Sequence, residues 1–266
     1  LCANNIYRNG NEDQRRRYLP DLCSGRKVGA LGLTEPGAGS DALGSMRTTA
    51  RREGDHYVLN GSKIFITNGP VADVLLVYAK TDRAKGAHGI SAFIVEKDMP
   101  GFKVAQKLVK MGYRGSQTGE LLFEDCRVPA QNLVGGENRG VAVVMSGLDL
   151  ERAMISPLCL GIAERALELS IDYAKTRKAF DRPIADYQGV TFPLAESATE
   201  LHGAHLMGLN AALLLDQGAP AIKELSMAKA YSVQVGYRAV DRAMQTHGAM
   251  GFTNEVGLHH AWHSLR

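Results

Sequence analysis

The sequence predicts an α+β multidomain protein in which a middle antiparallel β-barrel or sandwich domain is followed by an antiparallel helical bundle. Three observations carry this prediction. The length of 266 residues is too long for one small domain. The composition, 45% hydrophobic and 22% charged, is that of a globular protein. The hydrophobic period changes twice along the chain, from helical to strand-like and back to helical.

The first 27 residues are predicted to be helical and polar. Asn11 precedes the acidic pair Glu12 and Asp13, and three arginines follow at residues 15–17. Acidic residues early and basic residues late suit the dipole of a short helix.

Residues 28 to about 129 have the pattern of strands. Short β-rich runs recur at 28–34, 46–51, 56–59, 63–67, 74–80, 90–95 and 121–128. Gly, Pro, Asn and Asp separate them, which favours a barrel or a sandwich. Asn60-Gly61 lies between two of the runs and predicts a hairpin, because both residues tolerate a positive φ. No helical crossover of adequate length separates the runs, so a parallel doubly wound sheet is disfavoured.

From about Gly140 onward the apolar residues recur with the period of a helix. The predicted apolar stripes are Val141, Val144, Met145 and Leu148; Leu194, Ala198, Leu201, His205, Gly208, Ala212 and Leu215; and Leu225, Ala228, Ser232, Val235 and Ala239. Long amphipathic helices with short loops between them, such as the one at Gln217-Gly218, are typical of an antiparallel bundle.

The charge balance and the cysteines exclude several classes of protein. Lys and Arg number 31 against 28 Asp and Glu, and a net charge of +3 does not imply a nucleic-acid or membrane-surface partner. Charged residues interrupt every apolar stretch, so no membrane insertion is expected. No signal-peptide pattern is present, although a chain that begins with Leu1 leaves an upstream targeting segment open. The four cysteines lie far apart, which predicts reduced thiols in an intracellular protein.

Two motifs of the strand region are candidate ligand contacts. Residues 33–41 read LTEPGAGSD; they lack the third glycine of a dinucleotide fingerprint, and no amphipathic helix follows. Their backbone N–H groups and hydroxyls can bind a polar ligand, but composition alone favours a plain Gly/Pro turn. Residues 65–69 (FITNG) can place a flat face and a donor beside an aromatic ligand, or form an ordinary strand end.

Two further candidates lie in the helical region. Glu151 follows Leu148 by three residues and Val144 by seven, so it lies near the apolar face of its helix. A carboxylate desolvated there is a better base near neutrality; the alternative is a Glu paired with a neighbouring Arg on a solvated rim. Arg177 and Phe180 can hold a phosphate and stack on a base, or form a basic helix end that complements the dipole.

Near the end of the chain, residues 245–252 read QTHGAMGF. Glycines at a helix end permit close approach of a ligand, although a C-cap requires nothing more. His259, His260 and His263 have helical spacing, but no carboxylate or thiolate stands at a standard offset, so no metal site is predicted.

In order, these segments resemble the acyl-CoA dehydrogenase family, and its isovaleryl-CoA dehydrogenase branch in particular. The resemblance runs through nearly the whole chain. The segments that carry it are 8–12 with 18–20, 33–41, 65–69, 92–97 with 99–102, and 145–152. It implies three domains: the end of an N-terminal helical domain at 1–27, a middle β domain at 28–135, and an incomplete C-terminal four-helix-bundle domain at 136–266.

The resemblance also implies FAD as the cofactor. The implied FAD-binding residues are Leu33, Thr34, Gly39, Ser40, Phe65, Ile66, Thr67, Arg177, Phe180, Gln188, Gln245, Gly248 and Ala249. Those from Arg177 onward match positions that hold the adenine–pyrophosphate half of an FAD belonging to a neighbouring subunit. A dimer-based homo-oligomer, commonly a tetramer built as a dimer of dimers, is therefore implied.

The implied reaction is α,β-dehydrogenation of an acyl-CoA thioester. Glu151 falls where the isovaleryl branch keeps its catalytic base, and Ser40, Asp149 and Arg152 fall on the substrate side. A carboxylate removes the α-proton while the β-hydrogen leaves as hydride to flavin N5, and the electrons pass to an electron-transfer flavoprotein or similar acceptor. Most members of the family carry the base on a loop that would lie beyond Arg266.

Some positions depart from the family pattern. Phe65 replaces the Trp of a Trp-Ile-Thr motif, and Asp181 replaces the usual Gly after Phe180. His247-Gly248-Ala249 replaces Phe-Gly-Gly, and Ala142 replaces a substrate-side tyrosine.

The resemblance places the protein in fatty acid or branched-chain amino acid catabolism. It implies the cytoplasm if the protein is bacterial and the mitochondrial matrix if it is eukaryotic, and no secretion. Two alternatives stay open. One is a flavin oxidase of the same fold that acts on an acyl-CoA or a nitroalkane, and the other is a catalytically inactive flavoprotein that serves as a scaffold or assembly subunit.

Overall fold

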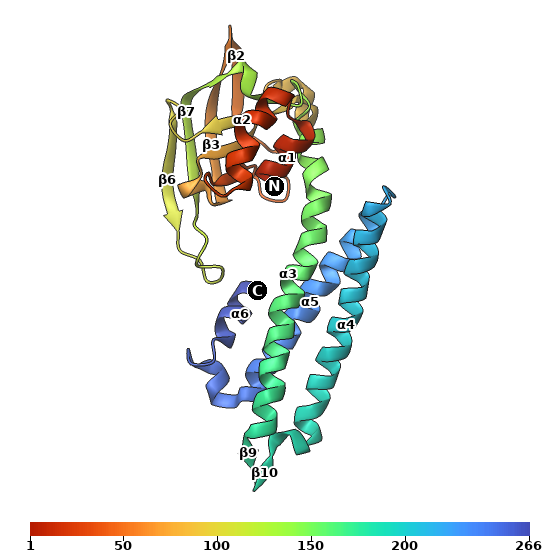
Figure 1. Cartoon of the computed structure of the whole chain (residues 1–266). Helices are drawn as coiled ribbons and strands as arrows, with labels where there is room; N and C mark the ends of the chain where they lie inside the picture. Colours follow the sequence, from red (N-terminus) through yellow and green to blue (C-terminus); the bar gives the residue numbers. More distant parts are fainter. The chain divides into compact units, whose positions relative to one another are not determined.

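The computed structural model describes residues 1–266, which form two compact units. The first unit consists of Leu1–Lys110 and Arg114–Leu148, and the second of Met111–Tyr113 and Asp149–Arg266. Figure 1 labels the helices and strands of both units.

The first unit is a sheet with two helices on one face. Its helices are α1 (Cys2–Asn9) and α2 (Glu12–Cys23). Its strands are β1 (Gly29–Gly32), β2 (Thr49–Glu53), β3 (His56–Thr67), β4 (Val74–Lys80), β5 (Ile90–Glu96), β6 (Phe102–Leu108), β7 (Thr118–Pro129) and β8 (Leu133–Val134). Short 3₁₀ turns lie at Gly69–Val71, Arg83–Gly89 and Ala130–Asn132.

The eight strands form one mixed sheet in the order β6-β7-β3-β2-β4-β5-β8, and β1 pairs with β4 in parallel. Apart from β1 and a single position of β2 against β4, neighbouring strands are antiparallel. The sheet does not close, because β6 and the two-residue β8 end the path without pairing with each other. The predicted fold class is confirmed in its sheet or sandwich form, and its closed-barrel form is wrong.

Strand β4 forms the centre of this unit, because both of its faces are buried. Leu75 and Val77 contribute to one apolar cluster with Phe93 of β5. Leu76 and Tyr78 contribute to a second cluster, which includes Ile6 and Tyr18 of the two helices. Helices α1 and α2 lie against this face of the sheet (Figure 1). Strand β1 pairs with this buried strand, so β1 and the loop that follows it are anchored to the core of the unit.

The hairpin predicted at Asn60-Gly61 is wrong, because β3 runs without interruption through both residues. The turn lies earlier, at Gly54 and Asp55, where Glu53 of β2 pairs with His56 of β3. A β-bulge takes the place of the predicted hairpin, since the register of β3 against β7 shifts between Leu59 and Gly61.

Gly61 has a packing role in this bulge. Its φ is +145, a conformation that L side chains rarely adopt. Its backbone also lies so close to Thr48 that an added Cβ would be 2.5 Å from Thr48 Oγ1. Asn60 tolerates the bulge because its side-chain amide exchanges two hydrogen bonds with Asp125 of β7, at 3.0 and 2.9 Å.

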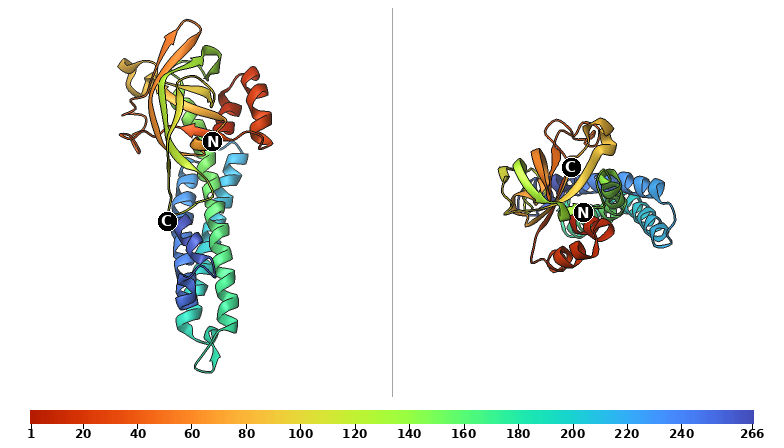
Figure 2. Two further views of the ribbon diagram at one scale, coloured as in Figure 1. Left: turned by 90° about the vertical axis from the view of Figure 1, so that its left-hand side faces the viewer. Right: turned by 90° about the horizontal axis from the view of Figure 1, so that it is seen from above.

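The second unit is helical (Figures 1 and 2). Its helices are the long α3 (Gly140–Thr176), whose first turns belong to the first unit, α4 (Gln188–Asp216), α5 (Ile222–His247) and the short α6 (Leu258–Leu265). A two-stranded hairpin of β9 (Lys178–Ala179) and β10 (Arg182–Pro183) and a 3₁₀ turn at Ile184–Asp186 connect α3 to α4, and a further 3₁₀ turn spans Gly248–Phe252.

One apolar core joins the four helices, which confirms the predicted helical bundle. Its buried members are Cys159, Leu160, Ala163 and Ala166 of α3, Leu201 and Ala204 of α4, Val235, Ala239, Val240 and Ala243 of α5, and Leu258 and Leu265 of α6. Many of these side chains are small, so the helices can approach closely. None of the helices combines the length and the apolar character that crossing a lipid bilayer requires.

Ion pairs connect α4 to α5 beside this core. Glu200 of α4 accepts hydrogen bonds from Arg238 at 2.9 Å and from Arg242 at 2.8 Å, and Arg242 also reaches Glu196 at 3.0 Å. Burial opposes ionisation of Glu200, but the two guanidinium groups lower its pKa below the ordinary value. A carboxyl whose pKa is lower in the folded state stabilises the fold at neutral pH, and loses that effect as the pH falls through its folded-state pKa.

We expect Glu200→Gln to destabilise the bundle by about 1 kcal/mol at pH 7 and to lose this effect in acid. The difference from the wild type, measured by urea unfolding at several pH values between about 7 and 3, should shrink once the pH drops below about 4. Glu168→Gln is the matched control, because the Glu168 carboxylate is exposed in an i,i+3 pair with Arg165. A difference between wild type and Glu200→Gln that does not depend on pH would contradict the ionic role.

Candidate cofactor site and active site

The loop at residues 33–40 follows β1 and lies beside β3. The backbone oxygen of Thr34 accepts a hydrogen bond from the N–H of Ile64 at 2.9 Å, which fixes the loop against the strand. Gly39 and Ser40 are exposed, and a Cβ added at Gly39 would meet no atom within 4 Å. The predicted residues Leu33, Thr34, Gly39 and Ser40 therefore lie together in one surface loop with open space above its backbone.

Phe65 stands out from β3 next to this loop. Its φ is +59, a conformation that costs an L-residue about 1–2 kcal/mol, and its side chain is 64% exposed. The register of β3 against β7 shifts between Lys63 and Ile66, so the strand is bulged at this point. A strained backbone that presents an apolar ring to the surface is typical of a ligand contact.

The other two residues of the predicted FIT segment differ in orientation. Thr67 is exposed, as a ligand contact requires. Ile66 is 3% exposed and belongs to the apolar cluster of the sheet, so only its backbone is available to a ligand.

A buried ion pair lies beneath the loop and the bulge. The Lys63 side chain is fully buried, and its Nζ donates to Glu35 Oε1 at 2.8 Å and to the backbone oxygen of Leu33 at 3.1 Å. The Glu35 carboxylate also accepts the N–H groups of Arg47 at 2.6 Å and Thr48 at 3.0 Å.

The pKa values of both partners are lowered, but for different reasons. Burial lowers the pKa of Lys63 to about 8, although Glu35 opposes this effect. Burial also opposes ionisation of Glu35, but the Lys63 ammonium and the two backbone donors lower the pKa of that carboxyl. The sequence patterns gave no signal for this pair, because a Lys in a strand and a Glu in a turn are ordinary surface residues.

In the second unit, Phe180 lies at the tip of the β9–β10 hairpin. Phe180 and Asp181 form its two-residue turn with φ values of +50 and +65, as a type I′ turn requires. Asp is one of the residues that tolerate a positive φ, so Asp181 can replace the Gly that the family pattern has after Phe180. The Phe180 ring is 90% exposed and meets Tyr187 edge-on at 6.3 Å. Gln188, the first residue of α4, is also exposed.

Helix α5 ends between two cavities that share Gly248. The smaller, of about 270 Å³, is lined by Arg177, Gly248 and Ala249 together with residues of α3 and α5. Arg177 gives this cavity a guanidinium group, and the open backbone at Gly248 lets a ligand approach closely. Both features suit a phosphate group.

His247 also lines the smaller cavity. Its ring is 4% exposed, stacks on Tyr173 at 4.4 Å, and donates from Nδ1 to the backbone oxygen of Ala243 at 2.8 Å. A flat ring with one satisfied donor can therefore replace the family's Phe at this position.

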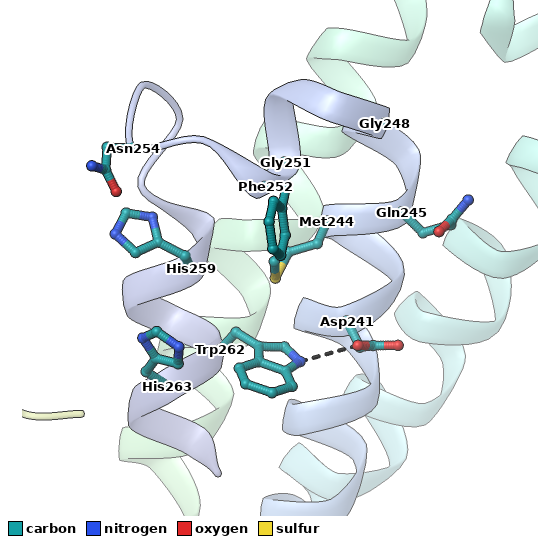
Figure 3. Close-up of a pocket in the computed structure, with 10 residues that line it drawn as sticks. All are labelled: Asp241, Met244, Gln245, Gly248, Gly251, Phe252, Asn254, His259, Trp262 and His263. Carbon is teal, nitrogen blue, oxygen red and sulfur yellow. Dashed lines mark hydrogen bonds between the residues drawn. The ribbon is translucent and has the colours of Figure 1, made fainter. Parts of the chain in front are cut away.

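The larger cavity, of about 540 Å³, lies between the end of α5 and helix α6 (Figure 3). Phe252, Met244 and Trp262 gather in it, and the Trp262 indole donates to Asp241 Oδ1 at 3.0 Å. Gln245 points away from this aromatic group (Figure 3). Aromatic side chains beside polar ones suit a flat ring with polar edges.

Glu151 lies on α3 with a carboxylate that no hydrogen bond or ion pair occupies. Its neighbour Arg152 pairs with Asp149 at 2.6 Å, so the predicted alternative of a Glu–Arg pair is not formed. Glu151 is half-buried. A carboxylate without a partner remains free to accept a proton.

The predicted site residues thus form separate groups within their own units. The loop at 33–40 and Phe65 are neighbours in the first unit. Arg177, Gly248 and Ala249 share one cavity of the second unit, and Gln245 and Gly248 share the other, whereas Phe180 and Gln188 line neither. The structure has no group of three or more His, Cys, Asp or Glu side chains that could hold a metal ion.

Comparison with known protein families assigns both units. Residues 30–126 match the middle domain of acyl-CoA dehydrogenases, and residues 138–266 match the C-terminal domain of acyl-CoA dehydrogenases. The chain belongs to the acyl-CoA dehydrogenase family.

Individual relatives agree with this assignment. The chain is 46% identical to mitochondrial isovaleryl-CoA dehydrogenase of Pongo abelii over 97% of its own length and 61% of that protein. Butyryl-CoA dehydrogenase from Megasphaera elsdenii is 41% identical, with a TM-score of 0.96 over 100% of this chain and 69% of that one. A structure of PigA with FAD and proline is 33% identical, with a TM-score of 0.96 over 99% of this chain and 69% of that one. The chain therefore spans less than two thirds of the length of its isovaleryl-CoA dehydrogenase relative.

Proposed function

We propose that this chain forms the middle and C-terminal parts of an FAD-dependent enzyme that dehydrogenates the Cα–Cβ bond of an acyl-CoA thioester. The observation that carries the proposal is the strained, exposed Phe65 beside the open loop at 33–40. The names of the relatives support an acyl-CoA substrate, and the similarity to both isovaleryl-CoA and butyryl-CoA dehydrogenases favours a short acyl group.

The residues present fit FAD. In the first unit, the Phe65 ring supplies a flat apolar surface, and the backbone around Gly39 is open to a polar ring edge. In the second unit, Arg177 and the backbone at Gly248 suit the pyrophosphate, and the aromatic side chains of the larger cavity suit the adenine. The relative solved with FAD supports this choice of cofactor. When bound, FAD supplies the acceptor for the hydride that leaves the β-carbon.

The protein's own part in the reaction is to remove a proton and to hold the thioester. We assign removal of the α-proton to Glu151, because its carboxylate is free of partners on α3. Arg152 is held in place by Asp149 and would contact the substrate from the neighbouring position. Ser40 is assigned to the substrate side of the first-unit loop.

We also propose that the enzyme is a homo-oligomer built as a dimer of dimers. The second half of helix α4, residues 206–215, is apolar except for Asn210, and Leu206, Leu209 and Leu213 are 52, 54 and 55% exposed. Exposed apolar surfaces of this kind often mark sites of protein–protein contact, and a second copy of the chain would cover this one. In such an assembly, Arg177, Phe180, Gln188, Gln245, Gly248 and Ala249 would hold the adenine half of the partner's FAD.

The remaining parts of the proposal follow the family resemblance. An electron-transfer flavoprotein or similar acceptor reoxidises the enzyme. The domains are the end of a helical domain at 1–27, a β domain at 28–135 and part of a bundle domain at 136–266. The protein acts in the cytoplasm of a bacterium or, like the mitochondrial relative, in the mitochondrial matrix of a eukaryote.

The test is flavin content and its response to substrate. The purified protein should be yellow, and its flavin absorbance should bleach without oxygen on addition of isovaleryl-CoA or butyryl-CoA. A protein that takes up no added FAD would rule out the proposal. Bleaching followed by rapid oxygen consumption would instead indicate an oxidase.

Arg177→Ala should raise the dissociation constant of FAD by ~10–100-fold, because a charge-assisted contact to a phosphate is lost. Lys178→Ala removes an exposed cation from the next position and is the matched control. Equilibrium dialysis of the two variants against FAD measures the effect. Equal FAD retention in both variants would show that Arg177 does not hold the cofactor.

A further inference from the structure

The Glu35–Lys63 pair joins three segments of the first unit that are distant in sequence. Glu35 lies in the loop after β1, Lys63 lies in β3, and the N–H groups of Arg47 and Thr48 lie just before β2. The Lys63 side chain is 0% exposed and that of Glu35 is 5% exposed. Removing two charges from water is costly, and apolar side chains of similar size would often stabilise a fold as well. The pair therefore calls for a role other than stability.

Its hydrogen bonds hold both ends of the segment at residues 36–46. Glu35 immediately precedes this segment, and its carboxylate accepts the N–H groups of the two residues that immediately follow it. Lys63 donates to the Leu33 carbonyl, so the chain entering the segment is held as well. Gly37 and Gly39, which have open space around them, lie between these fixed ends.

The same pair fixes the direction of Phe65. Lys63 stands at the point where the register of β3 shifts, and its ammonium makes two hydrogen bonds beneath the loop. With Lys63 held inside, the bulge brings Phe65, two residues later, to the surface at φ +59. The N–H of Ile64, between them, bonds to Thr34 of the loop.

We propose that Glu35 and Lys63 are a positioning pair, which holds the 36–46 loop and the Phe65 ring in the geometry that binds the flavin. This inference rests on the proposed function, since it names the residues that prepare the same FAD surface. Neither side chain is exposed enough to touch the cofactor, so the pair acts through the loop and the bulge.

The test replaces both members at once, because the double variant Glu35→Gln with Lys63→Met leaves no unpaired buried charge. The matched control is Glu124→Gln with Lys103→Met, which removes an exposed pair on β6 and β7 with a similar separation of 2.8 Å. We expect the first variant to bind FAD about tenfold more weakly or worse. Its bound flavin should have an absorption spectrum displaced toward that of free FAD. The control should match the wild type in both respects.

A folded Glu35→Gln, Lys63→Met protein with wild-type FAD affinity and spectrum would overturn the inference. If the double variant fails to fold, Glu35→Gln with Lys63→Gln takes its place, because it leaves no buried charge and its two side-chain amides can still hydrogen-bond to each other. Weaker binding then supports the positioning role, and unchanged binding overturns it.

A second measurement separates this inference from the proposed function. Amide hydrogen exchange of residues 36–46 should accelerate about tenfold in the double variant without any FAD. If the wild type binds no FAD, the proposed function fails, and faster exchange still supports the positioning of the loop. Unchanged exchange would overturn the inference, whatever the result with FAD.

Discussion

Replacing Glu151 by Gln is expected to slow reduction of the flavin by acyl-CoA by ~10²–10⁴-fold, because the proposed general base is lost. Gln has nearly the same volume as Glu but no basicity. Glu151 has no hydrogen-bond or ion-pair partner, so the substitution leaves no group unpaired, and folding and FAD content should be unchanged. The effect should therefore appear in the rate of the chemical step.

The measurement is anaerobic stopped-flow reduction by isovaleryl-CoA, after the FAD stoichiometry of each protein has been established. Glu164→Gln is the matched control, because Glu164 is exposed on the same helix and also has no partner. It should reduce at the wild-type rate. Reduction of the Glu151→Gln protein at the wild-type rate would assign the base to another residue and leave Glu151 without a catalytic role.

Helix α5 shows when an apolar stripe can be read from sequence alone. The predicted stripe of Leu225, Ala228, Ser232, Val235 and Ala239 is buried throughout. The residues between these positions include Lys, Gln and Arg, so only one face of the helix is apolar. The contrast between the faces fixes the rotation of the helix, and with it the buried residues.

Helix α4 shows the opposite case. Its predicted stripe contains Ala198, His205 and Ala212, which are exposed, whereas the buried positions include Ala204 and Ala211. The apolar residues of this helix do not gather on one face, so several rotations bury similar amounts of apolar surface. Packing against α3 and α5 decides among these rotations, and packing between helices cannot be read from one helix alone.

Some residues of the candidate site could likewise be predicted from sequence, and others could not. Local motifs marked Phe65 and the loop at 33–40 as candidate ligand contacts, with an ordinary strand end and a plain turn as the alternatives, and the structure places the two segments side by side. Lys63 was not predicted, because strict alternation along β3 puts it on the same face as Phe65. Only the bulge, a product of pairing with the distant strand β7, places Lys63 inside and Phe65 outside. The supporting residues of a surface site are therefore harder to predict than its exposed residues.

Breaking the pair by Lys63→Met should destabilise the protein by about 3–5 kcal/mol at pH 7, because the Glu35 carboxylate stays buried without its cation. Adding Glu35→Gln to Lys63→Met should recover most of this loss, since the uncompensated charge is removed. Lys103→Met, which leaves the exposed Glu124 in water, should cost at most about 1 kcal/mol. Urea unfolding of the four proteins measures these free energies.

The pH dependence distinguishes a buried charge from a packing defect. In the wild type, the pKa of Glu35 is lowered, so this carboxyl stabilises the fold at neutral pH. Without Lys63, burial raises the pKa of Glu35 in the folded state, so the variant gains relative stability as the pH falls and the carboxyl takes up a proton. The destabilisation by Lys63→Met should therefore shrink between about pH 7 and pH 4. A constant difference would instead indicate that Met packs poorly beneath the loop, and that the charge of Lys63 is not what holds the loop in place.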